Sequence, residues 1–387
     1  MTAVTWVQAL TLFFCAAWSV FYLWCIHIFR CLRTLPDVTP LPSLPGLTVI
    51  VPACNEAQTI RPALQKLLSQ DYPDLHIVAV DDRSTDATYP IIHELAVTDP
   101  RLEPLRIEVL AEGWLGKVHA LHRGAQRVRT DWILFTDADV HLTPGALRKA
   151  VSYAEREGLD HLAMMPTIRT EGFWLDVLVD AFLLIFFGSM RAHLADEPRS
   201  KAAFGVGAFN LVRRSTFERT PGFEWLRMEI ADDVGLGLMM KQAGGRSRLV
   251  LGLQAGWIDW YPSVGSMIRG LEKNVIGPIA HYRLDRFAAF VLTQALAVLA
   301  PWIALLLPMP YRLAGILTFG LMGLCGLIIS RRLCRSFWGF LFFPVGQALL
   351  GYTFWRAAYY CWRNKGILWR GTRYDLARLR AGQRVKI

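Results

Sequence analysis

The stretch WILFTDADVHLTPGALRKA, residues 132–150, begins as an apolar run and then carries two carboxylates separated by one residue, Asp137 and Asp139. Trp132 to Phe135 are apolar without alternation, which is the pattern of a strand buried on both faces. The carboxylates therefore follow the point where this strand reaches the carboxyl edge of a sheet. Open α/β sheets bind their ligands at that edge, so the stretch predicts both a fold class and the place of a site.

Strands and helices alternate through the middle of the chain. We expect strands within the segments 46–56, 75–88, 106–110 and 132–139, with helices at 59–70, after 82 and at 116–128. Strict alternation of this kind predicts βαβ units and an α/β fold with a mostly parallel sheet.

Polar side chains follow all four expected strands. They are Asn55 and Glu56, Asp81 and Asp82, the segment 112–117 with Lys117, and then Asp137 and Asp139. One polar strand end carries little information because loops are polar, whereas four at one edge indicate a site. Crowded carboxylates repel one another unless a cation compensates, and Mg²⁺ is commonly held by one or two carboxylates plus substrate phosphates. The pattern therefore predicts a metal-bound diphosphate, although no GxxxxGK[ST] sequence occurs.

Both ends of the chain are apolar. Residues 3–29 contain no Asp, Glu, Lys or Arg, and about 20 apolar residues suffice to span a bilayer. A signal peptide would have a shorter core and a cleavage site, and here Arg30 and Arg33 follow the core instead of preceding it. Three more charge-poor runs come late, at 287–311, 313–330 and 337–355.

These runs predict four parts of the chain. They are an N-terminal transmembrane anchor at 1–33, a cytoplasmic α/β domain with interfacial helices at 34–286, a C-terminal transmembrane region at 287–356 and a basic cytoplasmic tail at 357–387.

The formal net charge of +10 is explained by topology. Many basic residues flank apolar runs, as expected of the cytoplasmic borders of an inner-membrane protein, and they favour contact with anionic lipid over nucleic acid. Three late spans would nevertheless leave the basic tail on the wrong side. Pro344 and Gly346 make 337–355 the candidate for an irregular or re-entrant segment.

The seven cysteines are odd in number and scattered, and they form no CxxC pair. Neither a disulfide framework nor a zinc site is predicted.

Five ordered motifs carry a resemblance to a known family. They are VIVPACNE (49–56), AVDDRSTDAT (79–88), GWLGKVHAL (113–121), FTDADV (135–140) and EIADDVGLGLMMKQAG (229–244). In order and approximate spacing they resemble the family 2 nucleotide-sugar glycosyltransferases, in particular the membrane-bound lipid enzymes of the ceramide glucosyltransferase and hopanoid-associated types. The resemblance covers about residues 46–250 and implies a GT-A type domain.

The resemblance implies roles for the residues of the first two motifs. Pro52, Asn55 and Glu56 would line the pocket for the base and ribose. Asp82, with Asp81 behind it, would hydrogen-bond the base.

The same resemblance implies roles in the reaction itself. Lys117 would meet the diphosphate, Asp137 would touch the ribose or a divalent metal (Mg²⁺ or Mn²⁺), and Asp139 would bind that metal. Asp233 would be the general base for the acceptor hydroxyl, while Asp232 stands where the family usually has Glu. Independent chemistry agrees, because a nucleoside diphosphate leaves only if its charge is stabilised and a hydroxyl attacks poorly unless a carboxylate takes its proton.

Alternative interpretations of these residues stay open. Asp232 and Asp233 could cap the following helix, Lys117 could be a solvated lysine, and His141 is either an extra ligand or an ordinary loop histidine. Arg269 and Lys273 lie four residues apart on one helical face, and both could touch the donor's phosphates or extend toward the membrane surface.

Two further stretches bear on the acceptor. Residues 173–194 are apolar but interrupted by Asp176 and Asp180, which favours an interfacial helix over a span. Residues 204–214 contain glycines that permit close backbone approach, and family members contact the acceptor there. A buried core helix and strand is the alternative.

The resemblance implies an inverting, metal-dependent glycosyltransferase that moves a sugar from a nucleotide-sugar, by family habit a UDP-sugar, to a membrane lipid. Processive members carry a Gln-x-x-Arg-Trp motif, and the corresponding region 257–277 has none, so a polymer-threading enzyme is disfavoured. The alternatives are an enzyme that extends a polysaccharide and a catalytically silent protein that binds a nucleotide-sugar.

Overall fold

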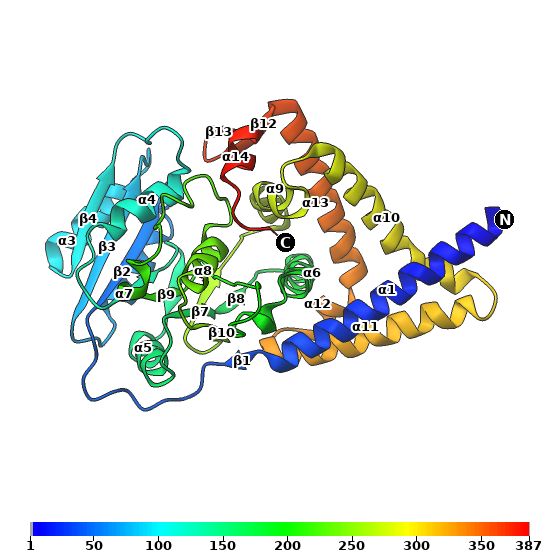
Figure 1. Cartoon of the computed structure of the whole chain (residues 1–387), viewed down its shortest axis with the longest axis horizontal. Helices are drawn as coiled ribbons and strands as arrows, with labels where there is room; N and C mark the ends of the chain where they lie inside the picture. The colour runs from blue at the N-terminus through cyan, green and yellow to red at the C-terminus, as the bar shows by residue number, and fades with distance from the viewer. Residues whose placement is uncertain (1–2, 387) are drawn as a thin grey trace.

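The computed structural model describes residues 3–386 and shows an α/β domain beside a group of long helices (Figure 1). The α/β domain is built on an eight-stranded sheet with the order β1-β10-β7-β9-β5-β2-β3-β4. Its strands are β1 (Arg33–Thr34), β2 (Leu47–Ala53), β3 (Leu75–Asp82), β4 (Leu102–Ile107), β5 (Trp132–Phe135), β7 (His161–Met165), β9 (Asn210–Arg213) and β10 (Ser247–Leu251).

The sheet is mostly parallel, as the alternation of strands and helices predicts. Only β9 runs antiparallel to its neighbours, β5 and β7. Leu47, Val49, Ile50 and Val51 of β2 are fully buried, because helices cover both faces of the sheet. The helices of the domain are α2 (Ile60–Leu68), α3 (Thr88–Thr98), α4 (Gly116–Ala125), α5 (Ala146–Arg156), α7 (Arg214–Phe217) and α8 (Asp232–Gln242).

The expected strand at 106–110 is wrong in its position, because β4 spans Leu102–Ile107. Glu103 and Pro104 obscured the pattern. β4 is the last strand of the sheet, and an edge strand tolerates both a proline, which has no N–H to donate, and a charged side chain. The other three expected strands contain β2, β3 and β5 and extend beyond their ends.

A small second sheet lies between the main sheet and the long helices. It has the order β6-β11-β8, with β6 (Val140–Leu142), β8 (Thr167–Arg169) and β11 (Gly256–Asp259). His141 in β6 stacks on Trp257 in β11 with ring centroids 5.2 Å apart. This packing favours the interpretation of His141 as a structural residue rather than a metal ligand.

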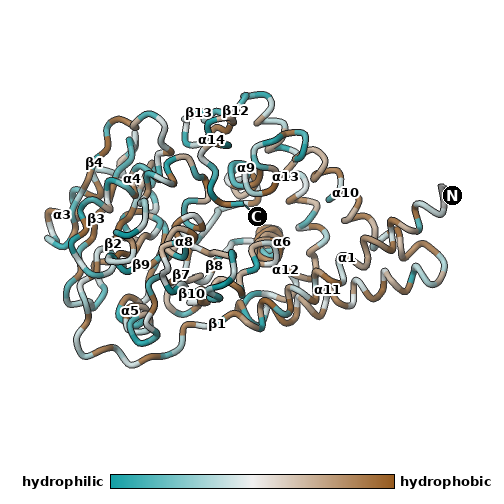
Figure 2. Tube along the Cα trace, viewed as in Figure 1, coloured by the Kyte–Doolittle hydropathy of each residue, from teal (hydrophilic) through white to brown (hydrophobic). Residues whose placement is uncertain are grey.

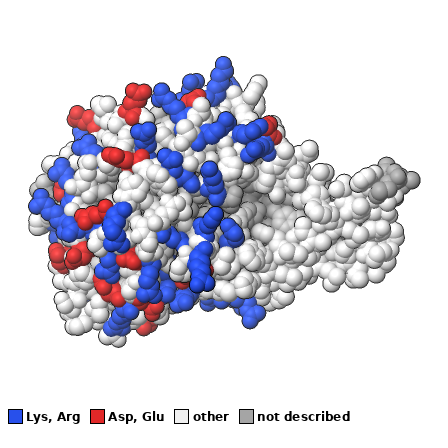
Figure 3. All heavy atoms as spheres, in the orientation of Figure 1, with Lys and Arg blue, Asp and Glu red and all other residues white. Residues whose placement is uncertain are grey.

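Four described helices are long and apolar enough to cross a membrane. They are α1 (Ala3–Cys31), α6 (Phe173–Met190), α10 (Leu284–Leu306) and α11 (Tyr311–Leu333). The hydropathy colouring of Figure 2 is brown along much of α1, α10 and α11, and the corresponding end of Figure 3 shows almost no charged side chains. Charged groups gather instead on the α/β domain (Figure 3).

Helices α1, α10 and α11 form one packed bundle. The Trp18 indole N–H donates to the Ala297 carbonyl at 2.9 Å, and the hydroxyls of Ser19 and Thr318 lie 3.2 Å apart. The loop between α10 and α11 lies at the end of the bundle far from the α/β domain, near the N-terminus (Figure 1).

Helix α6 is held differently, against α12 (Phe337–Leu341) and α13 (Phe343–Asn364). Its Asp180 is fully buried and pairs with Arg335, which also bonds Asp176 at 2.7 Å and the Ile168 carbonyl at 2.8 Å. The two acidic residues therefore interrupt the apolar run because they bind a buried guanidinium. The sequence favoured an interfacial helix here, and much of α6 is instead buried within the chain.

The last apolar run is irregular, as Pro344 and Gly346 predict. It breaks at Phe342 between α12 and α13, and α13 is not among the helices apolar enough to span. Helix α13 continues to Asn364, past the expected boundary at 356/357. The segment expected to be only a basic tail then folds into the hairpin of β12 (Gly366–Trp369) and β13 (Thr372–Asp375) and the helix α14 (Leu376–Gly382).

Candidate active site

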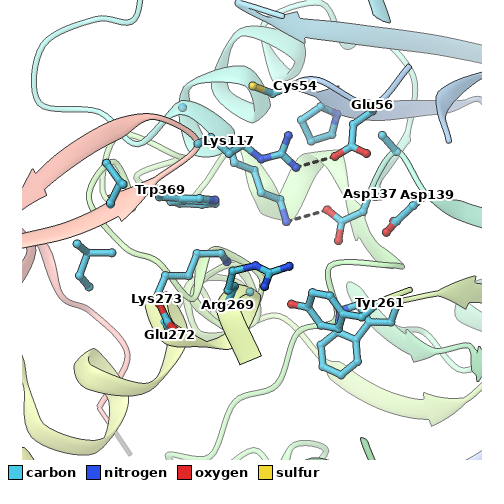
Figure 4. Close-up of a pocket in the computed structure, with 18 of the residues that line it drawn as sticks. Cys54, Glu56, Lys117, Asp137, Asp139, Tyr261, Arg269, Glu272, Lys273 and Trp369 are labelled. Atoms are coloured by element: carbon cyan, nitrogen blue, oxygen red, sulfur yellow. Dashed lines mark hydrogen bonds and ion pairs between the residues drawn. The ribbon is translucent and has the colours of Figure 1, made fainter. Parts of the chain in front are cut away.

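A cavity of about 1130 Å³ opens between the carboxyl edge of the main sheet and the helices that follow the α/β domain. Figure 4 shows the sheet-edge carboxylates on one side and α9 (Val264–Ala280) with the C-terminal hairpin on the other. Small-molecule sites usually measure about 300–1,000 Å³. The space is therefore sufficient for a large donor together with part of an acceptor.

Seven of the residues predicted from the sequence line this cavity. They are Pro52, Glu56, Asp82, Lys117, Asp137, Asp139 and Arg269. All but Arg269 follow or end strands of the sheet or begin α4, so the parallel topology brings them to one edge. The ends of β2, β3 and β5 meet in the cavity wall, as predicted, and the fourth contribution, Lys117, comes from the start of α4 and not from the end of β4.

Four other predicted residues do not line it. Asp81 is fully buried beneath the edge, with the Arg106 Nε 3.8 Å from its carboxylate. Asn55 is exposed and joins two loops, because its side-chain oxygen accepts from the Thr85 N–H at 2.8 Å and its own N–H donates to Ser84 Oγ at 2.9 Å. Asp232 and Asp233 lie behind the wall formed by Lys117 and Asp137, around a much smaller cavity.

Lys117 is the centre of a partly buried charge cluster. Its Nζ lies 2.7 Å from Asp137 and 3.5 Å from Asp232 (Figure 4 marks the first pair). Burial alone would lower the pKa of Lys117, but the carboxylates of Asp137, Asp232 and Asp233 outweigh it and raise that pKa. Lys117 is therefore a fixed cation, which disagrees with the interpretation of a solvated lysine.

Asp233 is held by backbone groups. Its carboxylate accepts from the Gly207 N–H at 3.0 Å and from the Val234 N–H at 2.8 Å. A Cβ at Gly205 would lie 1.7 Å from the Asp233 carbonyl oxygen, so only glycine allows this approach. Burial raises the pKa of both Asp232, to about 6, and Asp233, against the opposing charge of Lys117. A carboxylate poised in this way is suited to take a proton.

Asp139 has the most perturbed carboxyl group of the cavity wall. Burial, together with the charges of Asp137 and Glu56, raises the pKa of Asp139 to about 7. No three His, Cys, Asp or Glu side chains among residues 3–386 are grouped to hold a metal by themselves. Two carboxylates, Asp137 and Asp139, fit a divalent cation whose remaining ligands are phosphate oxygens and water, and such a cation would relieve their repulsion.

The opposite wall contains Lys273, which the sequence pattern paired with Arg269 as a possible phosphate contact, and further candidates that the sequence patterns missed. Of these, Glu272 comes from α9, Arg356 from α13, and Trp369 and Arg370 from the hairpin. Arg370 bonds Glu56 at 2.6 Å and Lys273 lies 4.4 Å from the ring centre of Trp369. The sequence offered one signal, the Trp-Arg-Gly turn at 369–371. Nothing in the local sequence indicates that this turn contacts Glu56, which lies 314 residues before Arg370 in the chain.

The fold and the cavity define a class of protein, an α/β domain whose mostly parallel sheet opens at an acidic carboxyl edge into a ligand-sized cavity. The sequence model of glycosyl transferase family 2 matches residues 48–220. These residues are therefore a family 2 glycosyltransferase domain.

Curated relatives agree with this assignment. The chain is 30% identical over 199 residues to a beta-monoglucosyldiacylglycerol synthase from Nostoc sp., a match that covers 50% of this chain and 41% of the relative. It is 30% identical over 129 residues to the GalNAc(5)-diNAcBac-PP-undecaprenol beta-1,3-glucosyltransferase of Campylobacter jejuni, covering 33% and 40% of the two chains. The chain thus matches about two fifths of the length of these relatives.

A solved structure shares the fold over most of the chain. The mannosyltransferase PcManGT from Pyrobaculum calidifontis, in complex with GDP-Man and Mn²⁺, superposes with a TM-score of 0.55 at 20% identity, covering 89% of this chain and 99% of that one. This likeness confirms the GT-A type fold.

Proposed function

We propose that the protein is an inverting, metal-dependent, non-processive glycosyltransferase that moves a sugar from a nucleotide-sugar to a membrane lipid. The observation that carries the proposal is the two-sided cavity. One side holds the carboxylates and Lys117 of the sheet edge, and the other reaches Arg356, Ala357 and Tyr360 of α13, beside the apolar helices.

The donor occupies the sheet edge in this proposal. Pro52 and Asp82 line the part for the base and ribose, while Lys117 stabilises the diphosphate. Asp137 and Asp139 would hold a divalent metal, as the relative solved with Mn²⁺ supports, and that metal would neutralise charge on the leaving diphosphate. The family's habit of UDP-sugars is the basis for choosing UDP.

Asp233 takes the proton of the acceptor hydroxyl in the proposed mechanism. The backbone N–H groups of Gly207 and Val234 fix its carboxylate, and Lys117 would contact the donor's phosphates from beside Asp137. Attack of the hydroxyl opposite the leaving diphosphate inverts the anomeric carbon. Asp232, 3.5 Å from Lys117, positions that lysine.

The membrane lipid is favoured by the arrangement of the helices. We propose that α1, α10 and α11 span the membrane and that α13 lies at its surface. This assigns a position to each helix of the expected transmembrane regions. The side chains of Tyr352, Trp355, Tyr359 and Trp362 are exposed along one side of α13, with the Trp355 and Tyr359 rings stacked. Exposed aromatic side chains of this kind are typical of a membrane–water interface.

This arrangement resolves the charge conflict of three late spans. With two spans after the α/β domain, that domain and the C-terminal end lie on one side. Arg332 at the end of α11 donates to the Phe29 carbonyl at the end of α1, at 3.1 Å, so the basic ends of both helices share one level. The positive-inside rule supports a cytoplasmic position for the domain in this proposal, and the basic residues at this level would favour anionic lipid.

A nucleotide-release assay on the detergent-purified chain tests the proposal. A panel of UDP- and GDP-sugars is tried with and without Mg²⁺ or Mn²⁺ and a total lipid extract, with Asp139→Ala as the inactive comparison. We expect one donor to release its nucleotide only with metal and lipid. Donor binding without turnover in any extract would instead support a silent nucleotide-sugar-binding protein.

A further inference from the structure

The tip of the C-terminal hairpin reaches into the donor side of the cavity. Arg370 and Gly371 form the turn between β12 and β13, and Trp369 and Arg370 line the cavity. Arg370 bonds Glu56, which follows the first strand of the sheet edge, at 2.6 Å (the dashed line to Glu56 in Figure 4). A segment beyond the matched family domain therefore contributes a cation to the site.

The hairpin is attached to the domain on both sides of its tip. Before it, α13 ends at Asn364. On β13, Tyr374 accepts from the Gly116 N–H at the start of α4, at 3.4 Å. After it, the Glu229 carboxylate accepts from the N–H groups of Arg384 and Val385, at 2.6 and 2.9 Å. The tip is thus held over the site instead of hanging free in solvent.

Arg370 occupies a backbone conformation that costs energy. Its φ is +46° and that of Gly371 is +76°. Glycine and asparagine adopt the left-handed region at lower cost than arginine, and non-glycine residues held there are often found at functional sites. The turn alone therefore does not account for an arginine at its first position, whereas a task for the guanidinium does.

Glu56 is a partner that an anion can replace. One of its oxygens accepts from Thr59 Oγ1 at 2.9 Å, and the other accepts from Arg370. Two more cations, Arg269 and Lys273, line the same cavity and form no ion pair with any carboxylate of residues 3–386. A diphosphate entering here would meet three cationic side chains from the wall opposite Lys117. Arginine forms bidentate bonds with phosphate as readily as with carboxylate.

We propose that Arg370 binds the diphosphate of the donor, exchanging Glu56 for phosphate oxygens when the donor enters, so that the C-terminal hairpin is one wall of the donor site. The proposal rests on the proposed function, because it assigns a further ligand to the same nucleotide-sugar.

The test compares Arg370→Asn with Arg373→Asn in the full chain. Asparagine suits the left-handed turn, so the first variant removes the guanidinium and keeps the hairpin. Arg373 is exposed on the same hairpin, outside the main cavity, and serves as the control. The Kd values of UDP, GDP and uridine are measured by calorimetry with Mn²⁺ present.

One of the two nucleoside diphosphates should bind the wild-type chain. We expect Arg370→Asn to raise the Kd of that diphosphate by roughly 10- to 100-fold, the usual effect of losing a charged hydrogen bond. Uridine binding and the Arg373→Asn variant should be unchanged. Equal diphosphate Kd values in wild type and Arg370→Asn would overturn this inference while leaving the proposed function standing. If wild type binds neither diphosphate, the proposed function falls, and this inference falls with it.

Discussion

The two walls of the cavity come from opposite parts of the chain and are organised in different ways. The sheet-edge wall, from Pro52 to Asp139, is held by parallel strands whose ends must meet. The wall of α9, α13 and the hairpin is held by contacts between segments far apart in the sequence, such as Arg356 with Glu272 at 2.6 Å. The first wall carries the carboxylates of the sheet edge and Lys117, and the second joins them to the apolar helices.

The largest expected effect is on the chemistry beside the sheet edge. Asp233→Asn removes the proposed base, so kcat should fall roughly 10²- to 10⁴-fold while the donor Kd stays the same. Steady-state nucleotide release and calorimetry measure the two quantities. An Asp233→Asn variant that retains kcat would show that another group takes the proton. The kcat of Asp232→Asn is measured beside it for comparison.

The next effect concerns Arg335, which joins helix α6 to strand β8 through its bonds to Asp180 and the Ile168 carbonyl. Arg335→Leu leaves Asp180 buried without its partner, which costs about 3–5 kcal/mol of stability. A large fall in Tm, followed in detergent by tryptophan fluorescence, is the expected result. Arg61→Ala is the matched control, because its pair with Glu94 is on the surface and worth at most about 1 kcal/mol. Equal Tm changes in the two variants would contradict the interpretation that Arg335 stabilises the fold by pairing with the buried Asp180.

A smaller effect is a pH dependence from the second wall. Burial, with the charge of Lys117, lowers the pKa of Lys273 to about 8, so this side chain loses its positive charge as pH rises through 8. Diphosphate affinity should therefore fall by roughly tenfold between pH 7 and pH 9, a range in which the phosphates themselves stay ionised. Lys273→Met should remove this dependence, and a control outside the cavity, Lys149→Met, should retain it. If diphosphate affinity depends on pH in Lys273→Met as it does in wild type, a group other than Lys273 causes the dependence.

The smallest effect separates a loop role from a binding role at Asn55. Because Asn55 joins its loop to Ser84 and Thr85, Asn55→Ala should lower Tm by about 2–4 °C and leave the donor Kd unchanged. Thermal unfolding and calorimetry on the same sample decide between the roles. A donor Kd weakened tenfold or more would restore the base-pocket role that the family resemblance implies.

The sequence predicted the first wall well because its order is local. Each strand end is marked by its own residues, and parallel topology then places Glu56, Asp82 and Asp139 at one edge. It missed β4 because an edge strand need not be apolar. Of the second wall, the sequence indicated only Arg269 and Lys273, through their spacing on one helical face. The hairpin could not be predicted, since Arg370 and Glu56 are joined only through the packing of the segments between them.

Burial also decided where individual predictions failed. Asp81 and Asp82 are adjacent in a strand, so their side chains point to opposite faces, and only Asp82 lines the cavity. Asp176 and Asp180 suggested a polar face on α6, but they bind one buried arginine. In both cases the sequence indicated that the aspartates matter, but it did not show which groups surround them in the fold.

The most direct test of the central claim is transfer of radiolabelled sugar from a nucleotide donor to lipid by the purified chain in nanodiscs that contain a total lipid extract. The two-walled cavity predicts metal-dependent label in the organic phase, lost in Asp233→Asn and Asp139→Ala. Nucleotide release with all label left in the aqueous phase would contradict a lipid acceptor, and with it the function assigned to the second wall.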